Sequence, residues 1–129
     1  MSVILRVSLF LLGVLYIVIG FGFLTDPVGS GADFGIAPMA DAGSQGLATI
    51  RGDLTSFFWV LAGSLIVGAW KANASLLKVG AALVGIVFVV RGVSAVIDGT
   101  FEGWFMPMGV ELLTVVLALA AARILPDDD

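Results

Sequence analysis

The stretch LVGIVFVVRGVSAVID, residues 83–98, decides the fold class of this chain. It is apolar along most of its length, yet it carries Arg91 in its middle and Asp98 at its end. A helix needs about 20 residues of this kind to cross the hydrocarbon core of a bilayer, which is roughly 30 Å thick. A continuous apolar run of this length favours a helix over a strand, which would alternate apolar and polar residues. The stretch therefore predicts a membrane-spanning helix with a charge inside the lipid.

The composition of the whole chain points to the same environment. Hydrophobic residues make up 60% of the 129 residues, and charged residues only 12%. A typical soluble domain carries about 25% charged residues. A water-soluble fold of this size could not avoid large exposed apolar patches. Since the length fits one domain, the sequence predicts a single all-α integral membrane domain over residues 1–129.

Four segments are long and apolar enough to span a bilayer as helices, in which every backbone group can be paired. They cover about residues 5–24, 47–70, 76–97 and 105–125, with outer loops at 25–46 and 98–104. The sequence thus predicts a four-transmembrane-helix bundle. Residues 13–26 and 85–98 also align without gaps, which suggests a parallel repeat of two hairpins.

The charges that flank the spans predict the orientation of the chain. Arg6, Arg123 and the lysines of the segment 71–78 fall on one side of the predicted bundle. The two outer loops instead carry acids, namely Asp26, Asp33, Asp41, Asp98 and Glu102. By the positive-inside rule, we expect both termini to be cytoplasmic and both acidic loops to face outward.

The loop at 25–46 is rich in Gly, Ala, Pro and Asp, a composition that is typical of turns. We expect room there for one short interfacial helix near residues 38–48. Phe34 and Ile36 are expected to dip into the headgroup region of the bilayer.

The residue types that the chain lacks exclude several classes of function. Without cysteine there can be no disulfide, zinc thiolate site or thiol catalysis. Without histidine, the commonest metal ligand and the usual general base are missing. We therefore expect no enzyme activity, no catalytic residue, no bound metal and no cofactor. The dispersed lysines and arginines form no basic patch for nucleic acid.

Arg91 and Glu111 are predicted to pair inside the membrane. Arg91 lies seven residues before Asp98, and Glu111 lies seven residues after Trp104. At about 1.5 Å per residue, both side chains start roughly 10 Å below the outer ends of neighbouring helices. An unpaired charge at the centre of such a helix costs about 2.5–3.5 kcal/mol. A pair of opposite charges at the same depth reduces that cost.

The stretch TIRGDLTSFF, residues 49–58, adds Arg51 and Asp53 at the entrance of the second span. Residues two apart point to different sides of a helix, so we expect one of them to join Arg91 and Glu111 and the other to reach the headgroups. These four residues are the candidate site. They form either a buried network that fixes helix packing or an ion, proton or small-anion site. The balance of charges and the apolar inner halves of the helices favour the packing role.

Several short motifs are similar to those of a known family. They are Pro27 after the first span, Phe34-Gly35 in the outer loop, Ile50-Arg51-Gly52, Arg91-Gly92 and Glu111. Together with the length, they resemble the small bacterial four-helix membrane proteins grouped as domain of unknown function 4345, and more loosely the DoxX-like proteins. The resemblance implies a bacterial inner-membrane location and makes Arg51, Arg91 and Glu111 part of the family pattern. It implies no activity.

The sequence therefore predicts a structural or accessory subunit of a membrane assembly. Its expected partners are the lipid bilayer and other membrane proteins or further copies of the chain. The alternative is a small oligomeric transporter or channel that uses the charged cluster near the outer leaflet.

Overall fold

The computed structural model describes residues 1–128, and among these residues it contains helices but no strand. Four segments are long and apolar enough to cross a membrane, namely Ser2–Thr25, Gln45–Trp70, Ala74–Ile97 and Phe105–Pro126. The prediction of four helices that are long and apolar enough to span a membrane is confirmed. Asp129, the last residue of the predicted domain, lies outside the described residues.

The elements follow one another with short connections. In chain order they are α1 (Ser2–Thr25), α2 (Pro27–Asp33), a 3₁₀ turn (Ala40–Ala42), α3 (Gln45–Thr49), a π-helical turn (Ile50–Leu54), α4 (Thr55–Trp70), α5 (Ala74–Ile97) and α6 (Phe105–Asp128). The second span is thus built from three consecutive pieces, α3, the π-helical turn and α4. The short helix expected near residues 38–48 is present as the 3₁₀ turn and α3.

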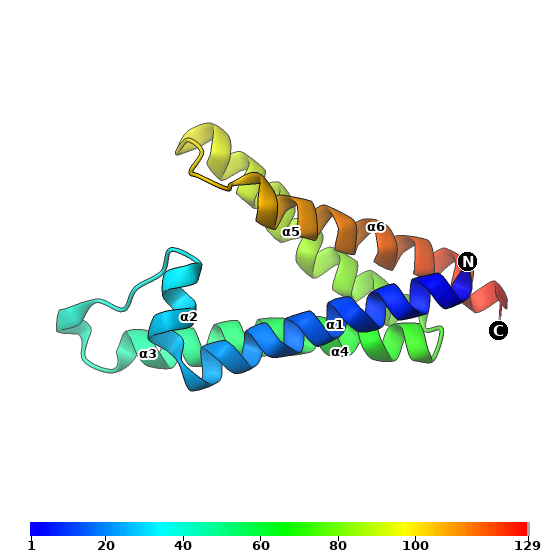
Figure 1. Cartoon of the computed structure of the whole chain (residues 1–129), viewed down its shortest axis with the longest axis horizontal. Coiled ribbons are helices and arrows are strands. Elements are labelled where there is room, and N and C mark those ends of the chain that lie inside the picture. Colours follow the sequence, from blue (N-terminus) through cyan, green and yellow to red (C-terminus); the bar gives the residue numbers. More distant parts are fainter. Residues whose placement is uncertain (129) are drawn as a thin grey trace.

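Figure 1 shows the long helices as two pairs that meet at one end and diverge toward the other. Helix α1 packs along α4, and α5 packs along α6. The pairs are held together by contacts of α5 with α4 and of α6 with α1. The start of α1, the end of α6 and the turn between α4 and α5 lie where the pairs meet, which we call the closed end. The segments 26–49 and 98–104 lie where the pairs diverge, which we call the open end.

The core of the bundle lies toward the closed end. Each long helix contributes at least one leucine that is completely buried, and α4 contributes two; they are Leu9, Leu61, Leu65, Leu77 and Leu125. Small residues between them, such as Ala62 and Ala118, are also fully buried. In lipid, helices associate by close packing rather than by hiding apolar surface from water, so small residues at the contacts are expected. The closed end is therefore tightly packed.

A glycine on α1 lets α4 approach closely. A Cβ atom at Gly20 would overlap the indole of Trp59. The Trp59 indole lies across this glycine and donates a hydrogen bond from Nε1 to the Ile17 carbonyl at 3.2 Å. The backbone carbonyl of Gly20 in turn accepts a hydrogen bond from the Thr55 hydroxyl at 3.3 Å. The glycine therefore fixes the spacing of α1 and α4.

Helix α2 was not predicted, although its first residues carry a standard start signal. The Asp26 carboxylate accepts a hydrogen bond from the Gly29 backbone N–H at 3.1 Å, as an N-cap residue does. Pro27 follows at the first helical position, where its missing N–H leaves no bond unmade. The residues that predicted a turn here begin a helix instead.

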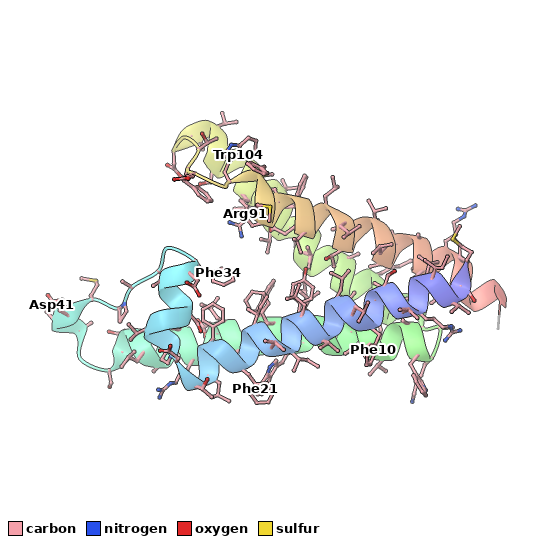
Figure 2. The ribbon with its side chains drawn as sticks, viewed as in Figure 1. Phe10, Phe21, Phe34, Asp41, Arg91 and Trp104 are labelled. Atoms are coloured by element: carbon pink, nitrogen blue, oxygen red, sulfur yellow. The ribbon has the colours of Figure 1, made fainter. Side chains whose placement is uncertain are left out.

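The end of α2 is also defined by a glycine. Gly35 has a φ of 74°, and the Ile36 N–H donates to the Gly31 carbonyl at 2.8 Å. This is the Schellman arrangement, in which a left-handed residue reverses the chain after a helix. Because the chain reverses there, Phe34 lies at the very end of α2 and is carried toward the space between the helix pairs (Figure 2).

Candidate functional site

An apolar cavity of about 200 Å³ lies between the two helix pairs. Its lining is almost entirely hydrocarbon, and its charged groups are Arg91 and Glu111. A wider space of about 650 Å³ adjoins it and is lined by both sides of the open end. The two share Phe34, Arg91 and Pro107 in their linings, so they are adjacent. We call the two together the cleft, and the wider part its mouth.

One wall of the cleft carries a column of aromatic rings. Tyr16 stacks on Phe58 with ring centres 5.9 Å apart, and Phe58 stacks on Phe23 at 5.7 Å. Phe34 completes the column, with its ring centre 5.1 Å from that of Phe23. Each such pair contributes about 0.5–1.5 kcal/mol beyond the burial of its area. Phe34 packs on this column because α2 turns back toward the cleft, and its place in the headgroup region stays a prediction.

The opposite wall is formed by α5 and α6. Val84, Val87 and Arg91 line the cavity from α5, at a spacing that places them on one helix face. Arg91 Nε donates to both carboxylate oxygens of Glu111, at 2.8 and 3.2 Å. The Glu111 side chain is only 10% exposed and that of Arg91 is 32% exposed. The structure therefore brings Arg91 and Glu111 together, as the sequence predicted.

The ion pair leaves much of the Arg91 guanidinium unused. Both hydrogen bonds to Glu111 come from Nε, and within residues 1–128 the terminal Nη1 and Nη2 groups have no hydrogen-bond partner. Each of these nitrogens carries N–H donors. Arg91 also lines the apolar cavity, the mouth and a third space beside Ser94 and Asp98. Its free donors are thus available to a molecule that enters the cleft.

The mouth of the cleft carries two acids. Asp33 lines it from the end of α2, and Glu102 lines it from the loop between α5 and α6. Both residues are exposed. Neither side chain has a hydrogen-bond or ion-pair partner in the part of the chain that the structure describes. A third acid of the open end, Asp98, accepts a hydrogen bond from the Ser94 hydroxyl at 2.9 Å.

The floor of the cleft is closed by a hydrogen bond between the first and last helices. The hydroxyls of Tyr16 and Thr114 lie 2.8 Å apart. Since the Thr114 hydroxyl donates its proton to the Val110 carbonyl at 2.8 Å, Tyr16 is the donor of this bond. Below it lie the buried leucines of the closed end. The cleft therefore opens at one end of the bundle only.

Arg51 and Asp53 do not join the ion pair. Both are exposed, and neither side chain makes a hydrogen bond or ion pair with any residue from 1 to 128. They lie on the π-helical turn before α4, whereas Arg91 and Glu111 lie on the pair α5 and α6, which has diverged from α4 at this end. The predicted cluster of four charges is thus reduced to a pair. The packing role of the Arg91–Glu111 pair stays a prediction.

We expect Tyr16→Phe to lower the stability of the protein by about 1 kcal/mol, the usual worth of one neutral hydrogen bond. The ring stays in the aromatic column, and only the bond to Thr114 is lost. Thermal unfolding in mild detergent would measure the effect. Combining it with Thr114→Val in a double-mutant cycle isolates the bond. Single and double variants whose effects simply add would show that this hydrogen bond does not couple α1 to α6.

No protein-family model matches the chain, and comparison with curated proteins and with solved structures finds no match. The resemblance stated above therefore stays a prediction from its motifs. Among residues 1–128 there is also no group of three or more acidic side chains close enough together to hold a metal ion. The site is defined by its own geometry: an apolar cleft, one arginine with unused donors and two exposed acids.

Proposed function

We propose that this small membrane protein is an accessory subunit of a bacterial inner-membrane assembly, and that it works through its cleft. The observation that carries the proposal is a cleft open at one end only. At the open end the chain offers part of its apolar interior to another molecule, and at the closed end the buried leucines seal the bundle. About three quarters of the chain, 96 of 129 residues, lies in the four candidate spans, which supports a role by contact within the membrane.

The charges of the two ends support a defined orientation. The closed end carries Arg6, Arg123 and the lysines of the α4–α5 turn region, and the open end carries the acids of its loops. Basic segments are retained in the cytoplasm. We therefore propose that both termini are cytoplasmic and that the cleft opens in the outer leaflet.

The native mass of the protein tests the accessory role. After extraction from its own membranes in mild detergent, the chain is expected to run with other polypeptides in a particle much larger than itself. The matched control is the same chain produced in a foreign host and extracted in the same way, which should run as a small particle. If the chain runs alone, or only with copies of itself, in both cases, the accessory role is wrong.

The second candidate function is a small transporter. It is favoured by the Arg91–Glu111 pair, which lines a cleft that has one opening. Transport would require the closed end to open in turn. Because the chain has no cysteine, a single Ala118→Cys change gives a unique thiol in the sealed core. Under the accessory role, a membrane-impermeant thiol reagent should not label it from the closed end, whereas Lys78→Cys, an exposed position near that end, should be labelled. Equal labelling of both would favour transport.

A further inference from the structure

We infer that the cleft binds a phospholipid whose headgroup carries both a phosphate and a primary ammonium. The phosphate would lie on Arg91, the ammonium between Asp33 and Glu102, and one acyl chain in the apolar cavity. The inference rests on the proposed function in one respect, since it takes the cleft as the working part of the protein.

The phosphate site follows from the way Arg91 is held. Glu111 binds the guanidinium through Nε, which fixes its position and leaves the terminal nitrogens free for other partners. Two parallel N–H groups of an arginine match the oxygens of a phosphate in a bidentate arrangement. Arg91 borders both the apolar cavity and the mouth. A phosphate bound there would stand at the boundary between them, as the phosphate of a phospholipid stands between its chains and its headgroup.

The chain site follows from the size and lining of the cavity. An apolar protein cavity of about 150 Å³ stays dry and accepts a small hydrocarbon such as benzene. The cavity here has a volume of about 200 Å³ and is lined by residues such as Leu15, Ile19 and Phe57. Within a bilayer the surrounding solvent is itself hydrocarbon. Part of an acyl chain is therefore the natural occupant of this cavity.

The ammonium site follows from the charges of the mouth. Around the cleft, the single cation Arg91 faces three carboxylates, those of Glu111, Asp33 and Glu102. A headgroup with only negative charge would be repelled by Asp33 and Glu102, because like charges brought together are unfavourable. A headgroup that also carries a cation would bind them. A primary ammonium has N–H donors for these carboxylates, and a trimethylated ammonium has none.

Lipid retention by the reconstituted protein tests the inference. The full-length chain would be placed in nanodiscs with equal amounts of phosphatidylethanolamine, phosphatidylcholine and phosphatidylglycerol, and the lipids that stay bound would be identified by native mass spectrometry. We expect phosphatidylethanolamine to be retained about tenfold more than each of the others, as one charge-assisted hydrogen bond would give. Equal retention of the three lipids would overturn the inference.

Substitutions of the two acids at the mouth of the cleft test the headgroup contacts and leave the buried core unchanged. The double change Asp33→Asn with Glu102→Gln should abolish the preference for phosphatidylethanolamine over phosphatidylcholine. Asp41→Asn is the matched control, because Asp41 is an exposed acid at the tip of the outer loop, away from the cleft (Figure 2). Arg91→Lys keeps a cation beside Glu111 but loses the two parallel N–H groups that match a phosphate. Retention of all three lipids should therefore fall. An unchanged preference for phosphatidylethanolamine in the double variant of Asp33 and Glu102 would contradict the ammonium site.

A bulky side chain in the cavity tests the acyl-chain contact. Val87→Trp should abolish retention by filling the cavity, whereas Val89→Trp places the same ring on a 61% exposed position of the same helix and should leave retention intact. Soluble phosphoethanolamine, which has no chain, should not displace the lipid. Displacement by this compound would show a headgroup site only and would overturn the lipid assignment.

These results are separable from those on the accessory role. A large native particle combined with unselective lipid retention would refute the lipid inference and leave the accessory role intact. A chain that runs alone but retains phosphatidylethanolamine selectively would do the reverse.

Discussion

Glu111→Ala is expected to destabilise the detergent-solubilised protein by an amount at the lower end of about 3–5 kcal/mol, the range for breaking a buried ion pair. The Glu111 side chain is 10% exposed, and its carboxylate is the only group within residues 1–128 that accepts a hydrogen bond from the Arg91 side chain. Its removal would leave a guanidinium without an anion beside the apolar cavity. Because Arg91 is 32% exposed, solvent or headgroups would relieve part of the cost. Thermal unfolding would measure the loss.

Removing both charges should restore much of that stability. In the double variant Arg91→Met with Glu111→Met, no unpaired charge remains, and two apolar side chains of similar length fill the space. Replacing buried ion pairs by apolar residues is often neutral or stabilising. Glu102→Ala is the control for loss of an acid, because Glu102 is exposed and unbonded in the described chain. If both Arg91→Met and Glu111→Met alone melt like the wild type, the pair does not hold the bundle together.

Gly20→Val is expected to destabilise the bundle by about 1–3 kcal/mol, the usual cost of overpacking a close contact. Any side chain at this position overlaps the Trp59 indole, which is held in place by its bond to the Ile17 carbonyl. Either the indole must leave that bond, or α1 must move away from α4. Both changes loosen the pair that carries the aromatic column.

The matched control for this change is Gly63→Val, on α4. A Cβ atom at Gly63 meets nothing within 4 Å, so the same substitution in a helix of the same bundle should be tolerated. The two variants would be compared by thermal unfolding in the same detergent. If they have equal melting temperatures, the close approach at Gly20 does not contribute to stability.

The loop after α1 illustrates what could be predicted from the sequence and was not. Its Gly, Pro and Asp residues were interpreted as turn formers, which is their commonest role. The order in which they occur, Asp26-Pro27 followed by Gly35, is that of a capped helix with a left-handed end. The signal was therefore present, but the seven-residue helix Pro27–Asp33 is too short to show an apolar period.

The candidate site divides into a part that periodicity could predict and a part that it could not. Arg91 and Glu111 were matched by depth on neighbouring helices, and depth follows from counting residues. Placing Arg51 or Asp53 beside them assumed a regular helix in a closed bundle. The π-helical turn at Ile50–Leu54 changes the direction of their side chains, and the divergence of the helix pairs moves them away. That divergence is a tertiary property that no local pattern encodes.

The aromatic column falls between these two cases. Tyr16 and Phe23 are seven residues apart, so they lie on one face of α1, and this could have been inferred. That Phe34 would join them depends on α2, which was not predicted. The open cleft itself could not be derived from composition, because an apolar face toward a cavity and one toward lipid look the same in sequence.

The hydrogen bond between Tyr16 and Thr114 joins residues 98 positions apart and has a consequence for biogenesis. Helices α5 and α6 adjoin in sequence and can pair as soon as both have left the ribosome. Helix α1 enters the membrane first, yet it gains its neighbour α6 only when the last span arrives. Contacts between distant parts of a chain form late and slowly. During synthesis the polar Tyr16 hydroxyl thus lies in lipid without its final acceptor. A chain that ended before α6 would have a first helix that cannot complete its packing.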